Sequence, residues 1–355
     1  MKNLNGLLNI SYPIIQAPML GVTTPSMVAA VSNSGGLGSL PVGGLSPEKT
    51  ITLIRETKAR TNRPFAVNLF AHSVETRVSE EDLRKMENYL RKLQEKYRLP
   101  FQHKALSDYH FYNHLDQIDI LLDENIPVVS FTFGLPETQI IEQLKEQGIK
   151  VIGTATSVKE AKLLDHAGVD AITAQGIEAG GHRGSFIPGE PLPQVGLISL
   201  VPQIVDAVTV PVIAAGGLFD HRTIRAAFAL GAEGAQLGSY FIAAEESEAN
   251  EGYKECLLHS NDTSTELTRA FSGKWARGIR NSFMEEMNNS ALNIPYYTYQ
   301  NSLTTALRAY GKSNGINDII SMWAGQSASQ SKRGSTENLF RELIVQIQNQ
   351  SNPIF

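Results

Sequence analysis

The chain has 355 residues, of which 31 are Lys or Arg and 36 are Asp or Glu, giving a formal net charge of −5. With 42% hydrophobic and 19% charged residues, the chain can build a large core, which excludes a disordered protein. The slightly acidic balance provides no extended positive field for nucleic acid. The single cysteine, Cys256, excludes a disulfide framework and a multi-cysteine metal site.

Eight short apolar segments along the chain indicate strands. Each is almost continuously apolar instead of alternating with polar residues, which is typical of strands buried on both faces of a parallel sheet. The predicted strands are residues 13–18, 36–40, 65–69, 128–132, 151–155, 171–175, 211–215 and 234–238.

Helix-like segments separate these strands, and four have clear patterns: residues 24–32, 137–147, 157–167 and 222–230. In the third, Ser157 is followed three residues later by Glu160, the arrangement of a capping box. Gly168 and Gly231 follow the third and fourth segments, where a helix C-terminus favours glycine. Eight strands, each followed by a helix, predict an α/β fold of the (β/α)8 TIM barrel type. A doubly wound parallel sheet has the same periodicity, but the count of eight favours closure.

Two segments do not follow this alternation of strand and helix. Residues 72–117 form a polar insertion after the third strand, and residues 247–355 follow a barrel domain expected to span 1–246. The C-terminal segment is expected to form a helical cap or lid over the barrel mouth. Within the insertion, apolar residues three or four apart predict an amphipathic helix packed on the barrel wall, with a dimer contact or an active-site lid as alternatives: Leu83, Met86, Leu90, Leu93 and Tyr97.

No apolar run approaches the roughly 18 residues that a membrane-spanning helix needs. The N-terminal segment also lacks the continuous apolar region of a signal peptide. A cytoplasmic protein without nucleic-acid or membrane partners is therefore expected, as a monomer or homodimer.

Glycines follow the last two predicted strands. Gly216 and Gly217 end the seventh, and the eighth reads Gln236-Leu237-Gly238-Ser239. Barrels of this type bind ligands at the carboxyl ends of their strands, and phosphate commonly lies after the seventh and eighth. Because glycine lets backbone N–H groups approach phosphate oxygens, these residues predict a phosphate site, although tight turns would also need glycine.

The loop after the sixth strand, residues 175–184, contains four glycines and His182. So many glycines indicate unusual backbone angles or a close approach to a ligand. An imidazole presented at a strand end suits anion binding or proton transfer near neutral pH. A structural histidine in a turn is the alternative.

Several segments together resemble the nitronate monooxygenase family over nearly the whole chain: 15–19, 67–70, 129–134, 175–184, 214–218, 236–239 and 322–326. The resemblance is to the class I enzymes of bacteria. It implies an FMN-dependent oxidation of propionate 3-nitronate and similar alkyl nitronates by O2, giving an aldehyde or keto product and nitrite.

The resemblance also implies residue roles. His182 would be catalytic and would orient the nitro group by hydrogen bonding, and residues 323–326 would help close the flavin site. His221 stands where the family usually has glycine, and it is expected to modify the phosphate corner. No metal is implied. The residues expected to bind FMN are Ala17, Pro18, Met19, Asn68, Gln175, Gly180, Gly181, Gly216, Gly217, Gln236, Leu237, Gly238 and Ser239.

Two alternatives stay open. An FMN-dependent enoyl-acyl carrier protein reductase resembles this family and shares the loop from Glu178 to His182. Residues 130–134 and 323–326 favour the oxygenase. A barrel that binds flavin or a phosphorylated metabolite without turnover is the other alternative, and it would not require a titrating group at position 182.

Overall fold

The computed structural model describes residues 3–72, 78–100 and 102–349. Its main feature is an eight-stranded parallel sheet in the order β1-β9-β8-β6-β5-β4-β3-β2. Backbone bonds from Leu37 N to Ile14 O and from Gln16 N to Leu37 O, both 3.0 Å, join the two ends of this order and close the barrel. All eight predicted strands are confirmed: β1 Ile14–Gln16, β2 Gly38–Pro41, β3 Phe65–Phe70, β4 Val128–Thr132, β5 Lys150–Ala155, β6 Ala171–Gln175, β8 Val212–Ala215 and β9 Gly234–Leu237.

A short helix at the N-terminus, α1 (Leu4–Leu8), covers the amino-terminal end of the strands. Leu4 and Leu8 are buried in one cluster with strand residues such as Ile15, Ile152 and Ile213. Because this end is filled by side chains, the carboxyl ends of the strands are left to bind a ligand.

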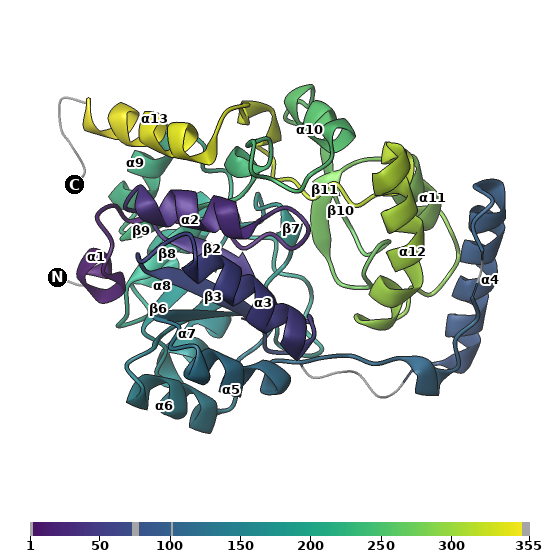
Figure 1. Cartoon of the computed structure of the whole chain (residues 1–355), viewed down its shortest axis with the longest axis horizontal. Helices are drawn as coiled ribbons and strands as arrows, with labels where there is room; N and C mark the ends of the chain where they lie inside the picture. The colour runs from purple at the N-terminus through teal and green to yellow at the C-terminus, as the bar shows by residue number, and fades with distance from the viewer. Residues whose placement is uncertain (1–2, 73–77, 101, 350–355) are drawn as a thin grey trace.

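Eight helices form the outer ring of the barrel (Figure 1). The four helix predictions are confirmed to within one or two residues. Ser157 Oγ accepts from Glu160 N, but the Glu160 carboxylate binds Thr156 N at 2.6 Å instead of Ser157 N, so the predicted capping box is incomplete. The ring consists of α2 Pro25–Asn33, α3 Pro47–Lys58, α5 Leu115–Asp123, α6 Thr138–Glu146, α7 Val158–His166, α8 Leu197–Val205, α9 His221–Ala229 and α13 Thr336–Gln348.

The last of these helices, α13, packs against α2 and α9 and so lies between the first and last helices of the barrel (Figure 1). Its Phe340 is 1% exposed and belongs to the main barrel core. The predicted domain boundary at residue 246 assigned α13 to the C-terminal cap. The packing of α13 on α2 and α9 makes it part of the barrel domain instead. The long segment between β9 and α13 is therefore an excursion from the barrel that returns to it.

The excursion carries helices α10 Glu251–Leu258, α11 Ser282–Asn288 and α12 Tyr299–Asn314. It also contains two strands that the sequence analysis missed, β10 Thr265–Thr268 and β11 Ala276–Ile279. These pair in an antiparallel sheet with β7, which is Gly181–His182 of the glycine-rich loop. The expectation of a helical cap was therefore incomplete, and this small sheet fixes the excursion to the His182 loop.

The insertion after β3 contains the predicted amphipathic helix, α4 (Glu80–Lys96), but it does not pack on the barrel wall. Met86 and Leu90 are buried in a cluster with Phe271, Phe283 and Leu307 of the excursion. Figure 1 shows α4 on the side of α11 and α12 that faces away from the barrel. These aromatic and aliphatic side chains give the apolar stripe of α4 its partner. Across the described ranges, no helix combines the length and apolarity needed to cross a membrane.

Candidate active site

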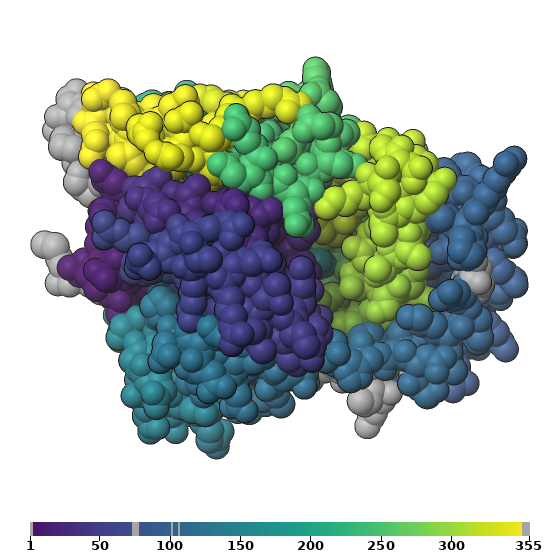
Figure 2. Space-filling view, in the orientation of Figure 1, coloured from purple at the N-terminus to yellow at the C-terminus, as the bar shows by residue number. Residues whose placement is uncertain are grey.

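A cavity of about 480 Å³ lies at the carboxyl ends of the barrel strands. The barrel forms one side of it, and the excursion forms the other with residues such as Tyr297, Arg308 and Trp323. Figure 2 shows the yellow-green residues of the excursion packed beside the purple barrel residues, with blue α4 on their outer side. The volume falls in the range of about 300–1,000 Å³ that is typical of small-molecule sites.

The structure brings nearly all of the predicted site residues together around this cavity. The exception is Leu237, whose side chain is 1% exposed and belongs to the barrel core. His221 begins α9 as expected but is not among the cavity-lining residues. The predicted residues that line the cavity are Ala17, Pro18, Met19, Asn68, Gln175, Gly180, Gly181, His182, Gly216, Gly217, Gln236, Gly238 and Ser239.

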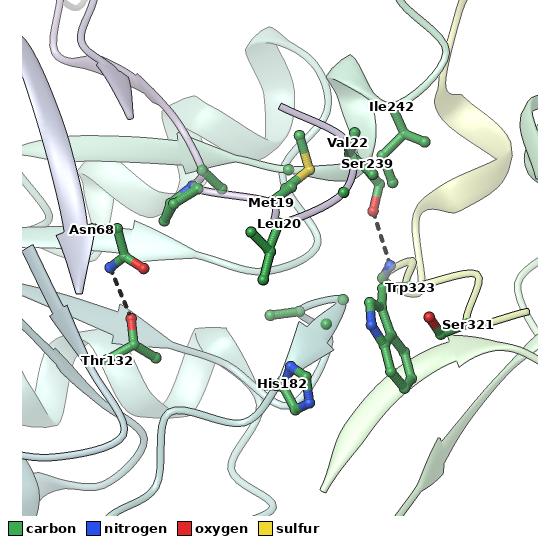
Figure 3. Close-up of a pocket in the computed structure, with 18 of the residues that line it drawn as sticks. Met19, Leu20, Val22, Asn68, Thr132, His182, Ser239, Ile242, Ser321 and Trp323 are labelled. Atoms are coloured by element: carbon green, nitrogen blue, oxygen red, sulfur yellow. Dashed lines mark hydrogen bonds between the residues drawn. The ribbon is translucent and has the colours of Figure 1, made fainter. Parts of the chain in front are cut away.

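Glycines at the ends of β8 and β9 form a cradle of backbone groups. Gly216 and Gly217 have φ angles of 122° and 68°, a region that disfavours residues with a Cβ. Within the described part of the chain, the N–H groups of Gly217 and Gly238 have no hydrogen-bond partner. Ser239 Oγ accepts from Gly325 N at 2.9 Å, a bond drawn in Figure 3, and keeps its own proton to donate. This donor set suits a phosphate.

The other end of the cavity combines apolar side chains with one amide. Asn68 donates from Nδ2 to Ser130 Oγ at 3.0 Å and to Thr132 Oγ1 at 3.1 Å. These bonds orient the side chain so that its oxygen points into the cavity (Figure 3). Met19 and Leu20 lie across from it. The result is an apolar surface with a fixed hydrogen-bond acceptor at its edge.

The glycine-rich loop is held rigidly by its own side chains. Gln175 donates from Nε2 to His182 O at 3.0 Å and accepts from Gly184 N at 2.8 Å. The buried guanidinium of Arg183 donates to Gly176 O and Gln175 O. At Gly180, a Cβ would lie 2.4 Å from Gly325 N, so only glycine allows the excursion to pack this closely on the loop.

His182 lies on the cavity wall between aromatic rings of the barrel and the excursion. Its ring centroid is 5.4 Å from that of Phe133 and 5.4 Å from that of Trp323. One ring nitrogen, Nε2, is 2.7 Å from Ser272 Oγ, while Nδ1 has no hydrogen-bond partner within the described ranges. Burial, together with the positive charges of Lys274 and Arg308, lowers the pKa of His182 to about 3. The imidazole is therefore neutral at pH 7.

Several residues in the cavity wall or next to His182 were not found by sequence reasoning. Tyr297 lies just before α12, Arg308 lies within that helix, and Ser272 lies between β10 and β11. The segments that contain these residues do not show the alternation of strand and helix that marks the barrel. The apolar spacing of α12 is the same as that of any helix packed on a core. No local signal pointed to them, because only the return of the excursion over the barrel brings them to His182.

A model of the nitronate monooxygenase family matches residues 1–346. A probable nitronate monooxygenase of Staphylococcus aureus strain JH9 is 44% identical over 349 residues, which cover 98% of this chain and 97% of that protein. The solved structure of nitroalkane oxidase from Streptomyces ansochromogenes is 33% identical with a TM-score of 0.87, covering 97% of both chains. The structure of FabK from Thermotoga maritima is 29% identical with a TM-score of 0.76, covering 98% of this chain and 96% of that one.

Proposed function

Because the chain belongs to the nitronate monooxygenase family, we propose that it oxidises alkyl nitronates with O2 in an FMN-dependent reaction. The products are an aldehyde or a ketone together with nitrite, and propionate 3-nitronate is the expected type of substrate. One observation supports this proposal above all: the neutral imidazole of His182 is held by Ser272 on the wall of the cavity. The far end of the same cavity has the backbone donors that suit a phosphate.

The residues present fit FMN. The unpartnered N–H groups of Gly217 and Gly238 and the hydroxyl of Ser239 would hold its phosphate. Met19 would pack against the isoalloxazine, and Asn68 would accept a hydrogen bond from it. Gln175 is more restricted than the sequence suggested, because both ends of its amide already bind the glycine-rich loop. FMN, when bound, supplies the electron transfer and the reaction with O2.

The chain's own contribution is orientation and electrostatics. A nitronate is already a carbanion equivalent, so little proton abstraction is required of the protein. The hydroxyl proton of Ser272 has two acceptors within reach, Lys274 O at 3.2 Å and the nearer His182 Nε2 at 2.7 Å. When it is donated to Nε2, the neutral imidazole keeps an N–H at Nδ1 to donate to a nitronate oxygen. Because this donor is fixed before substrate arrives, it stabilises negative charge on the nitro group without reorganisation. Phe133 and Trp323 exclude water around it.

The proposal is tested by His182→Asn in the purified holoprotein. Loss of one preorganised donor is expected to lower kcat/KM for nitronate oxidation by about 100-fold or more, while the visible spectrum of bound FMN is retained. Nitrite release and oxygen uptake are the measurements. His166→Asn changes an exposed histidine at the end of α7 and serves as the matched control. Unchanged turnover in His182→Asn would remove this role from the imidazole.

The enoyl-acyl carrier protein reductase remains the second candidate, since the loop that carries His182 is shared with that group. The same holoprotein separates the two reactions. Oxygen uptake with nitrite release from propionate 3-nitronate supports the oxygenase, and NADH oxidation dependent on an enoyl thioester supports the reductase. A flavin-bound protein that performs neither reaction would support the non-catalytic alternative.

A further inference from the structure

A second charged group lies on the wall of the cavity that contains His182. Arg308, on α12, lines this cavity together with Tyr297. Burial lowers the pKa of its guanidinium to about 10, so it still carries a positive charge at pH 7. Among the described residues, no carboxylate lies within 4 Å of it. Arg308 is therefore a largely buried cation without an anionic partner from the protein.

Neutral groups of its own helix fix one edge of the guanidinium. Nε donates to Thr304 Oγ1 at 3.0 Å, and Nη2 donates to the backbone oxygen and to Oδ1 of Asn301, both at 2.8 Å. A longer bond joins Nη2 to Thr305 Oγ1. Within the described ranges, Nη1 donates to no protein atom. The side chain is thus held in one orientation, with donor capacity left over.

Such an arrangement is costly for folding alone. A desolvated charge is destabilising unless an opposite charge and hydrogen bonds compensate it, and the acceptors around Arg308 are all uncharged. A guanidinium N–H also forms a charge-assisted hydrogen bond with a carboxylate, and Nη1 is left to form one. The positive charge of Arg308 acts on both His182 and Tyr297, which places it near the expected position of the substrate.

We propose that Arg308 is the specificity-determining residue of this site and that it binds a carboxylate at the end of the nitronate substrate remote from His182. This inference rests on the proposed function. His182 then orients the reacting nitro group, and Arg308 selects for substrates that carry a second negative charge. A nitronate with only an alkyl chain would leave the guanidinium without its partner.

Arg308→Met removes the charge and keeps an unbranched side chain. Propionate 3-nitronate and propyl-1-nitronate share a three-carbon skeleton and differ in a carboxylate or a methyl group at the far end. For the variant, kcat/KM is expected to fall by about 10- to 100-fold with the first substrate, the range for a charge-assisted hydrogen bond, and by less than about threefold with the second. Arg84→Met removes an exposed guanidinium on α4 and controls for net charge.

Equal losses with both substrates would overturn the proposal, because Arg308 would then act on the nitronate group itself or on the shape of the site. Arg308→Lys guards against a packing effect: it keeps the charge but loses the fixed direction of the Nη1 donor, and it should retain part of the preference for propionate 3-nitronate.

A binding measurement makes the inference independent of turnover. Succinate and butyrate imitate the two substrates, with a carboxylate in place of the nitronate group. Calorimetric titration of the holoprotein should give tighter binding of succinate, and Arg308→Met should abolish that difference. If the unmodified holoprotein oxidises neither nitronate, the proposed function fails, and the succinate preference still decides the role of Arg308. Equal affinities in the unmodified holoprotein would refute it.

Discussion

At the residue scale, the electrostatic state of His182 follows from its neighbours. Among the described residues, no carboxylate contacts the ring. Its polar partner there is the hydroxyl of Ser272, and the charges that act on it, from Lys274 and Arg308, are positive. A protonated imidazole would be a third cation in the same buried region. The site therefore keeps the imidazole neutral, and the positive charge available to an anionic substrate comes from Arg308.

This neutrality predicts a pH dependence of stability. The ordinary pKa of 6.5 is lowered to about 3 in the folded protein, so between these values the unfolded chain binds more protons at this residue. The contribution of His182 to the unfolding free energy is therefore highest above pH 6.5 and falls as the pH decreases towards 3. Replacing His182 with Gln should reduce the slope of unfolding free energy against pH, measured by urea unfolding at pH 7, 6 and 5.

His166→Gln, at an exposed position in the last turn of α7, is the comparison variant. The slope of the protein as a whole will not vanish in His182→Gln, because burial also lowers the pKa of His72, to about 4. An unaltered slope in His182→Gln would mean that the imidazole is not desolvated in the folded protein.

At the element scale, α4 and α12 form the outer support of the active site. α12 carries Arg308 on one face, and on its other face Leu307 is buried against the cluster that contains Met86 and Leu90 of α4. The insertion after β3 therefore supports the cavity indirectly. It packs against the excursion, and the excursion positions side chains in the cavity.

Truncation of Leu90, which is 1% exposed, tests this packing. Leu90→Ala should lower the unfolding free energy by about 2–5 kcal/mol, because it removes buried apolar area and leaves a cavity. The measurement is urea unfolding. Lys92→Ala, an exposed change on the same helix, should have little effect. A loss below about 0.5 kcal/mol in Leu90→Ala would show that α4 does not pack in this way in solution.

At the scale of the whole molecule, α13 completes the barrel. Phe340 lies against Gly36, where a Cβ would be only 2.6 Å from the ring, and its ring centroid is 6.3 Å from that of Tyr12. Helix α13 is thus packed on residues that flank the first and second strands. The ring of helices is continuous only because the chain returns from the excursion.

Phe340→Ala should therefore destabilise the barrel itself, by about 3–5 kcal/mol. Thermal or urea unfolding followed by far-UV circular dichroism measures the loss. Val345 is 46% exposed on the same helix, so Val345→Ala is the matched control and should change stability by much less. If α13 were a dispensable tail, the two variants would behave alike.

The barrel and the glycine turns could be predicted from the sequence because each depends on a short stretch of chain. A buried parallel strand is apolar throughout, and a turn such as Gly216-Gly217 shows its need for positive φ in its composition. The orientation of Gln175 could not be predicted, since its partners are backbone groups of a loop whose path the sequence does not specify.

The contacts between barrel and excursion were also beyond sequence reasoning. Ser272 and His182 are 90 residues apart, and no local pattern links them. Strand β11 of the excursion pairs with β7, the strand that contains His182. Because β7 has only two residues, it gives no periodic pattern in the sequence. For the same reason, the position of α4 could not be predicted. Its apolar stripe showed that the helix packs against another element, but the sequence did not show which element.

The position of α13 also has a consequence for synthesis on the ribosome. The chain emerges from its N-terminus, so the seam between α2 and α9 stays uncovered until α13 has been made. The apolar surface around Tyr12 and Gly36 remains open during that time, and the excursion has already emerged when it closes. The barrel is therefore closed only after the excursion that covers the active site has been made, and a chain that ends before residue 336 has a barrel with an open side.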